Sequence, residues 1–352
     1  GKLQGGFKPA DNTDFTVKGW WDGSYQHQKD QYLNDEMGFR ADLVRLNNQI
    51  DYSLFDKCHA GWTIKGKDCY MYQWPYTDAY YGNDYVGYQT VLDRSIKLKA
   101  IQDTLERLGK HLILVYMPSK ASSYPEYIPV DRVKAQIGMT NYRAYRHVGD
   151  SLGIRQVDMD AWFVSMKHSS KEPLYSKQGI HFTMYGATLC GDSLVRYMEG
   201  ITHIRVQHPD WSKMEHTDKI RGGDDDVSVE LNLIFPVCKE TLAYPIVKDI
   251  PDTATRKINA IYIGDSYTQK MVEFGIVHKM NGQCEFWSLF KELHDINHPK
   301  WSFMKDYDWK AAINTADCVV LAYTLFNFRD LGNGFIDQAY YHYYPMGVQA
   351  VK

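Results

Sequence analysis

Apolar residues recur along much of the chain at the spacing of helix faces. Within residues 36–57 the apolar positions are Phe39, Leu43, Leu46, Ile50 and Leu54. Their steps of three and four residues follow the turn of an α-helix, so the pattern predicts an amphipathic helix. A second helix is predicted over residues 89–109, with Gly109 as its stop. Residues 131–152, which end before Gly153, and residues 184–199 are predicted to be helical for the same reason.

Segments of strand length alternate with these helices. They cover residues 112–116, 154–157, 257–263 and 318–323, and residues 112–116 are a continuous apolar run. A strand that is apolar on both sides is typical of a parallel sheet whose two faces are both covered by helices. Strands separated by helices give the β-α-β pattern of such a sheet. The chain is therefore predicted to have an α/β fold with a mainly parallel central sheet.

Two segments depart from this alternation. Residues 1–35 are polar and rich in Gly, Asp and Gln, and we expect an irregular N-terminal arm. Residues 200–255 are charged and contain proline, and residues 227–235 within them resemble a strand. We expect an insertion of small strands and loops at about residues 200–255, within one domain that covers residues 36–352. Residues 58–88 are expected to form strands and loops, and a helix is expected from near Thr268 to about residue 280.

Composition and charge exclude several classes of protein. The 352 residues carry a net charge of −3 and have a pI of about 6.5, so the basic footprint of a nucleic-acid-binding protein is absent. No apolar run is long enough to span a membrane. Walker A, G-x-G-x-x-G and H-E-x-x-H motifs are absent, and the six cysteines form no C-x-x-C pair, so we expect no cofactor and no metal. Aromatic residues reach 14%, which fits either a carbohydrate groove or a Tyr-rich core and surface.

The tripeptide Gly-Asp-Ser occurs twice and offers two candidate nucleophiles. Ser266 follows the predicted strand 257–263 and precedes a predicted helix. This strand-turn-helix setting exposes a serine hydroxyl and points backbone N–H groups at a developing oxyanion. Ser193 lies within the predicted helix 184–199 and lacks that setting. We therefore predict Ser266 as the nucleophile, the alternative being a serine that caps a helix.

Other polar residues are candidates by position. His181 lies in a polar loop before the helix 184–199, where it is placed to act as a base or is simply an exposed histidine. Tyr323, Asn327 and Arg329 follow the last strand, and ligands of parallel sheets bind beyond the carboxyl ends of the strands. Asn327 would aid an oxyanion and Arg329 would bind a uronate or orient a loop, unless these residues form a structural polar network. Lys120 has the same two interpretations.

Four stretches together resemble a known family. In chain order they are MGFRADLVRLNNQIDYSLFDK with GKDCYMY, LGKHLILVYMPSKASSYPEYIP, GIHFTMYGATLCGDSL and IYIGDSYTQ. They cover about residues 36–330, and the histidine block precedes the serine block, whereas ordinary SGNH esterases have the serine first. The chain thus resembles the alginate O-acetyltransferase group of SGNH-like proteins, the AlgJ and AlgX type.

The resemblance implies an SGNH-like, flavodoxin-like α/β/α sandwich, with Ser266 as nucleophile and His181 as base. The family's triad aspartate stands two residues before the histidine, where this chain has Gly179. A missing orienting carboxylate costs several orders of magnitude in rate. Three outcomes stay open: another group such as Asp158 or Asp160 holds the histidine, the enzyme is slow, or the site binds without turnover.

The predicted function follows from this resemblance. We expect an exported O-acetyltransferase or acetylesterase that acts on an extracellular polysaccharide through a Ser-His acyl-enzyme. The alternative is a non-catalytic polysaccharide-binding or assembly protein on a degenerate SGNH scaffold. A polysaccharide acceptor and a membrane-bound acetyl-donor partner are the expected partners. The expected location is the periplasm or cell envelope, with a signal or anchor absent from this sequence.

Overall fold

The computed structural model describes residues 3–4, 10–134, 136–248, 256–296 and 301–345. In this part of the chain, seven strands form one sheet in the order β10-β9-β8-β7-β11-β3-β4. The strands from β8 to β4 run parallel, and β9 and β10 add an antiparallel edge. The bounds are β3 His111–Met117, β4 Gln156–Asp158, β7 Ile258–Gly264, β8 Asn281–Ser288, β9 Glu292–Asp295, β10 Trp301–Phe303 and β11 Cys318–Thr324.

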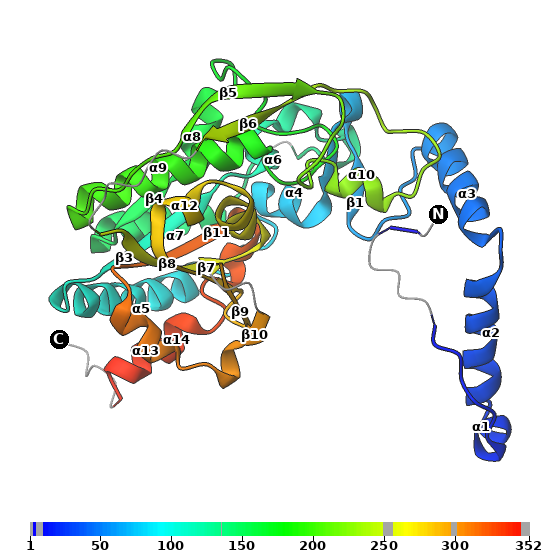
Figure 1. The fold of residues 1–352 in the computed structure, drawn as a ribbon, viewed down its shortest axis with the longest axis horizontal. Helices are drawn as coiled ribbons and strands as arrows, with labels where there is room; N and C mark the ends of the chain where they lie inside the picture. Colours follow the sequence, from blue (N-terminus) through cyan, green and yellow to red (C-terminus); the bar gives the residue numbers. More distant parts are fainter. Residues whose placement is uncertain (1–2, 5–9, 135, 249–255, 297–300, 346–352) are drawn as a thin grey trace.

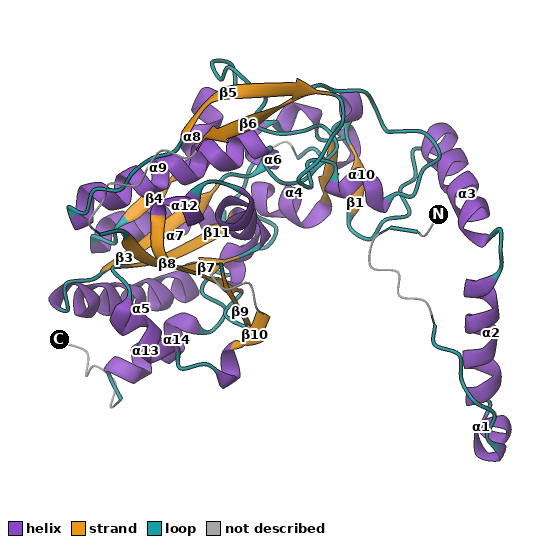
Figure 2. Cartoon of the chain, in the orientation of Figure 1, coloured by secondary structure: helices purple, strands orange, loops and turns teal. Residues whose placement is uncertain are grey.

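Helices cover both faces of this sheet (Figures 1 and 2). One face packs on α8 Met159–Met166, α9 Met184–Thr202 and α12 Val277–Met280. The opposite face packs on α5 Tyr88–Arg107, α7 Asn141–Leu152, α13 Trp309–Thr315 and α14 Phe335–Tyr343. The α/β fold with a mainly parallel central sheet is therefore confirmed.

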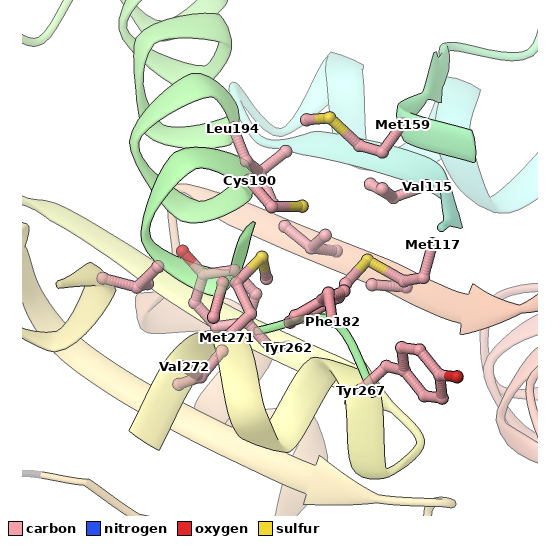
Figure 3. Close-up of a cluster of buried hydrophobic side chains, with 14 of the residues drawn as sticks. Val115, Met117, Met159, Phe182, Cys190, Leu194, Tyr262, Tyr267, Met271 and Val272 are labelled. Atoms are coloured by element: carbon pink, nitrogen blue, oxygen red, sulfur yellow. The ribbon is translucent and has the colours of Figure 1, made fainter. Parts of the chain in front are cut away.

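Side-chain alternation along the central strand explains why the strands are apolar throughout. In β11, Val320 and Ala322 enter the core beneath α9, whereas Leu321 and Tyr323 enter the core on the opposite face. Figure 3 shows part of the core beneath α9, where Phe182 packs among side chains from the sheet and the helices.

Several predicted elements end or begin elsewhere. The helix expected over residues 131–152 begins at Asn141, because Thr140 caps it through a side-chain acceptor. The helix expected from near Thr268 to about residue 280 begins at Ser266 and is interrupted: α11 Ser266–Gln269 passes into a π-helical turn, Lys270–Phe274, and α12 begins after Gly275. The segment 58–88 holds β1 Thr63–Lys65 and β2 Met71–Gln73 as expected, but also an unforeseen helix, α4 Trp74–Tyr81.

The N-terminal arm is helical rather than irregular. It contains α1 Val17–Asp22, with Thr16 as its cap, and α2 Ser24–Glu36, and it leads into α3 Arg40–Phe55. Residues 1–2 and 5–9 of the expected arm lie outside the described residues. Helix α3 is the predicted amphipathic helix, yet its apolar positions are exposed because the arm projects from the α/β body (Figure 1).

The insertion is built from a two-stranded ribbon and a short helix. Strands β5 Asp210–Thr217 and β6 Leu242–Lys248 pair antiparallel. Residues 227–235, expected to be a strand, instead lie in and after α10 Asp226–Glu230. Residues 249–255 of the expected insertion lie outside the described residues. Among the residues that are described, no helix is both long and apolar enough to cross a bilayer.

Candidate active site

Ser266 lies at the carboxyl end of the sheet, on a sharp turn between β7 and α11. The turn is tight because a Cβ on Gly264 would lie 2.1 Å from the carbonyl oxygen of Ala322 in the neighbouring strand. Ser266 is the first residue of α11, so its backbone N–H belongs to the first helical turn, which lacks intrahelical acceptors. Its side chain borders an open pocket.

The carboxylate of Asp265 fixes this turn to the next strand. Asp265 caps α11 by accepting from Tyr267 N at 3.1 Å. Its other oxygen accepts from the backbone N–H and the hydroxyl of Thr324, at 2.8 and 2.7 Å, and from Asn327 Nδ2 at 2.8 Å. Asn327 is therefore close to the nucleophile but supports the turn through Asp265.

His181 contacts Ser266 directly. Its Nε2 lies 2.8 Å from Ser266 Oγ. Two contacts with the residue after the serine hold the histidine loop: Tyr267 donates from its hydroxyl to the Ile180 carbonyl at 2.5 Å, and its ring centroid lies 4.4 Å from that of His181. The core beneath α9 thus brings together the two predicted residues, which are 85 positions apart in sequence.

The other ring nitrogen of His181, Nδ1, hydrogen-bonds to Oδ2 of Asp226. Oδ1 of Asp226 accepts from the backbone N–H of Ile180 at 2.8 Å. Burial alone would raise the pKa of Asp226, but the charge of His181 and these hydrogen bonds bring it below its ordinary value. Asp226, His181 and Ser266 therefore form a continuous acid-base-nucleophile chain.

Neither substitute acid considered from the sequence occupies this position. Asp158 caps α8 and pairs with Arg146 and Tyr142. Asp160 is buried and accepts from Ser119 N at 2.8 Å, and burial raises its pKa to about 7. Both aspartates are engaged at the end of β4 and the start of α8, away from the histidine loop.

Gly179 and Asp226 are adjacent in space. A Cβ on Gly179 would lie 2.5 Å from the Asp224 carbonyl oxygen and 3.0 Å from Asp226 Oδ1. The insertion therefore fills the space beside Gly179 and supplies a carboxylate there. A buried ion pair holds the insertion against the α/β body. In this pair Lys270 Nζ, four residues after the nucleophile, lies 2.6 Å from Asp224 Oδ1.

The loop that carries His181 is held from beneath by buried polar groups. Lys120 Nζ donates to the carbonyl oxygens of Met71, Lys177 and Gly179 at 2.7–2.9 Å. Glu240, from the insertion, accepts from the side chains of Ser176 and Gln178 and from Lys177 N. Lys120 thus has a structural role beneath the site.

The remaining predicted residues lie away from the reacting groups. Tyr323 is fully buried in the core on the opposite face of the sheet, because it alternates with Ala322 along β11. Arg329 is exposed, bonds to Asp330 and covers the Phe326 ring at 5.8 Å. The expectation that Tyr323 binds substrate is therefore wrong. Ser193 lies within α9, as predicted.

Tyr76 is a site residue that the sequence patterns did not single out. It lies on α4, lines the pocket with Ser266, and its hydroxyl neighbours the side chains of Ser266 and Thr324. Burial raises its pKa, so it is a neutral donor at physiological pH. Its segment is so rich in tyrosine that no pattern distinguishes one ring from another.

Comparison with known proteins gives matches in sequence and in fold. The SGNH hydrolase-like domain of the acetyltransferase AlgX matches residues 65–212, which include His181 but neither Ser266 nor Asp226. A protein of Pseudomonas syringae named as a probable alginate O-acetylase AlgJ is 26% identical over 172 residues, 49% of this chain and 42% of that protein. One of the same name from Azotobacter vinelandii is 21% identical over 284 residues, 80% of this chain and 69% of that protein.

The fold has a counterpart among solved structures. The O-acetyltransferase domain of Pseudomonas putida AlgJ aligns with 80% of this chain and 99% of its own, at a TM-score of 0.53 and 15% identity. The mainly parallel sheet, with its serine at a strand end and its histidine before a helix, is an SGNH hydrolase-like fold. Within that class, the chain is similar to the AlgJ/AlgX type.

Proposed function

We propose that this protein is an acyl-transfer enzyme, an O-acetyltransferase or acetylesterase that acts on a polysaccharide. The observation that carries the proposal is the hydrogen-bonded chain from Asp226 through His181 to Ser266 at the carboxyl end of the sheet. The names of the relatives, as alginate O-acetylases, support acetyl transfer as the reaction.

The proposed first half-reaction forms an acetyl-enzyme. Ser266 Oγ attacks the carbonyl carbon of an acetyl ester while His181 Nε2 takes the hydroxyl proton. The tetrahedral intermediate collapses, the bond to the donor oxygen breaks, and His181 returns its proton to that oxygen. Asp226 stabilises the imidazolium that forms in between and keeps the ring oriented.

The second half-reaction releases the acetyl group. An acceptor hydroxyl attacks the acetyl carbon of acetyl-Ser266, and His181 takes the acceptor's proton. The bond between the acetyl carbon and Ser266 Oγ then breaks, and His181 returns the proton to Ser266 Oγ. A sugar hydroxyl as acceptor makes the protein a transferase, and water makes it an esterase. In both half-reactions the Ser266 backbone N–H and the Tyr76 hydroxyl are the proposed donors to the oxyanion.

Location and donor follow from the resemblance to the family. We infer that the protein acts in the periplasm or cell envelope, where a membrane-bound partner supplies acetyl groups. The alternative, a binding or assembly protein without turnover, was motivated by Gly179. Asp226 supplies a carboxylate beside Gly179, so the glycine is no longer a reason to expect a site without turnover.

The test is hydrolysis of p-nitrophenyl acetate with intact-mass analysis of the protein. Turnover and a single acetyl adduct in the wild type, both absent in Ser266→Ala and both retained in Ser193→Ala, would support the proposal. Loss in Ser193→Ala alone would assign the other serine. Added oligosaccharides then separate transferase from esterase, because a transferase yields an acetylated sugar at the expense of free acetate.

A further inference from the structure

The lining of the pocket above Ser266 has an aromatic part and an acidic part. The pocket encloses about 430 Å³. Besides the three residues of the acid-base-nucleophile chain, its lining includes the aromatic rings of Trp62 and Tyr76, the amide of Gln73 and the carboxylate of Glu230. An acceptor hydroxyl must enter this pocket to reach an acetyl group on Ser266, so its lining determines which sugars fit.

The aromatic part forms an exposed platform. Trp62 is 51% exposed, and its ring centroid lies 6.2 Å from that of Trp74 and 6.3 Å from that of Phe326. Trp74 is itself 39% exposed. Exposed indole rings beside a polar pocket present flat apolar faces, which pair well with the C–H face of a sugar ring.

The charged part of the lining is acidic. Asp226 and Glu230 are the carboxylates of the lining, and no lysine or arginine is among the described residues that line it. Asp226 is engaged by His181 and Ile180, whereas the Glu230 carboxylate has no ion-pair partner in the described part of the chain. Burial and the charge of Asp226 raise the pKa of Glu230, as expected of a carboxylate without a compensating cation.

Three cations around the site are engaged by other groups. Lys270 pairs with Asp224 in the interior, and Lys120 is satisfied by three carbonyl oxygens. Arg329 bonds to Asp330 and covers Phe326, beyond the aromatic platform. A uronate in the pocket would therefore face Glu230 without a neutralising partner.

We propose that the acceptor is an uncharged polysaccharide, that Trp62 stacks on its sugar ring, and that Glu230 excludes uronates from the pocket. The inference rests on the proposed function for its acetyl-transfer step, but the preference itself is a property of binding. Like charges brought together in a partly enclosed pocket are repelled, so we expect about a tenfold preference for neutral chains at low salt, decreasing as salt increases.

Binding is measured by calorimetry on Ser266→Ala, in which turnover cannot interfere. The ligands are neutral hexasaccharides of glucose, mannose and galactose, with a mannuronate hexasaccharide as the charged probe. We expect a neutral ligand to bind more tightly than the mannuronate, Glu230→Gln to reduce the difference, and Trp62→Ala to weaken all of them. Glu36→Gln and Trp21→Ala, on exposed positions of the N-terminal arm, are the matched controls and should change neither.

Mannuronate binding that equals or exceeds that of every neutral ligand would overturn the inference, and so would a preference that Glu230→Gln leaves unchanged. Loss of mannuronate binding in Arg329→Gln would then assign uronate recognition to the outer rim. The proposed function is tested separately by the acetyl adduct. If neutral ligands bind more tightly but no acetyl adduct forms on Ser266, only the proposed acetyl transfer is refuted. If the adduct forms and its acetyl group passes to mannuronate, only the proposed class of acceptor is refuted.

Discussion

The carboxylate of Asp226 lies beside the α-carbon of Gly179, so close that a Cβ there would be 3.0 Å from Asp226 Oδ1. In the family that the sequence resembles, the acid stands at the position of Gly179, whereas here the carboxylate that bonds to His181 comes from Asp226, 45 residues after the histidine. Because it lacks a side chain, Gly179 leaves room for the carboxylate of Asp226. The hydrogen-bonded chain of acid, base and nucleophile is therefore present although a glycine stands at residue 179.

Gly179→Ala should lower both stability and activity, although Gly179 itself contributes no reacting group. The added methyl must displace the Asp224 carbonyl, 2.5 Å away, and with it Asp226. We expect a loss of about 1–3 kcal/mol in the free energy of unfolding, together with a fall in kcat. Urea unfolding and p-nitrophenyl acetate turnover check both. Gly200→Ala, at a helical glycine in open space, should be harmless, and a Gly179→Ala protein that matches it would refute the close contact.

Tyr76→Phe should slow acylation while leaving the fold intact. The change removes a hydroxyl next to Ser266 and leaves the ring contact with Tyr267 in place. Loss of one oxyanion donor lowers kcat by about 10² or more. Tyr175→Phe is the control, because the buried Tyr175 hydroxyl has no hydrogen-bond partner among the described residues. Equal kcat values in the two variants would remove Tyr76 from the mechanism.

The large elements of this fold follow from local pattern. Strands β3, β7 and β11 consist mostly of apolar residues, and a strand followed by Gly-Asp-Ser and a helix is enough to place Ser266 at the carboxyl end of the sheet. The sequence pattern does not predict β8, because residues 281–288 mix polar with apolar residues and lack the apolar run of a buried strand.

The third member of the site could not be predicted in the same way. Asp226 lies in an acidic run within an insertion, and no periodicity indicates where such a segment returns to the body. Its place is set by tertiary contacts, chiefly the buried pair of Asp224 with Lys270. Asp158 was considered because it follows a strand, but that strand lies at the far edge of the sheet.

Lys120→Met should reduce stability. Methionine fills similar space but leaves the buried carbonyls of Met71, Lys177 and Gly179 without their donor. We expect a loss of about 3 kcal/mol or more in the free energy of unfolding, measured in urea. Lys29→Met, on the exposed arm, should cost far less. A Lys120→Met protein of wild-type stability would mean that these three bonds do not support the histidine loop.

His208 should make stability depend on pH. Its Nδ1 faces Asp192 at 2.6 Å and its Nε2 faces Glu199 at 3.0 Å. The hydrogen bond to Asp192 raises its pKa above 6.5, against the opposing effect of burial and with help from Glu199. The folded-state pKa exceeds the unfolded one, so this stabilisation is complete below pH 6.5 and is lost as pH rises through the folded pKa.

The comparison is between the wild type and His208→Gln in urea at several pH values from 6 to 9. The difference in unfolding free energy should be largest at the acidic end and should shrink toward pH 9. His27→Gln, on the exposed helix α2, should show no such trend. If the difference in unfolding free energy between the two proteins grew as pH rises, the protonated His208 would not be the form that stabilises the fold.

The proposed mechanism depends most on Asp226, and the rate at which p-nitrophenyl acetate acetylates Ser266 tests the role of this carboxylate most directly. Stopped-flow release of p-nitrophenol with quenched intact mass would compare Asp226→Asn with the wild type, Asp158→Asn and Asp160→Asn. We predict a fall of about 10³–10⁴-fold in Asp226→Asn, because the asparagine no longer stabilises the imidazolium, and near-normal acetylation in the other two. Acetylation of Asp226→Asn at the wild-type rate, or its loss in Asp158→Asn or Asp160→Asn instead, would contradict the central claim.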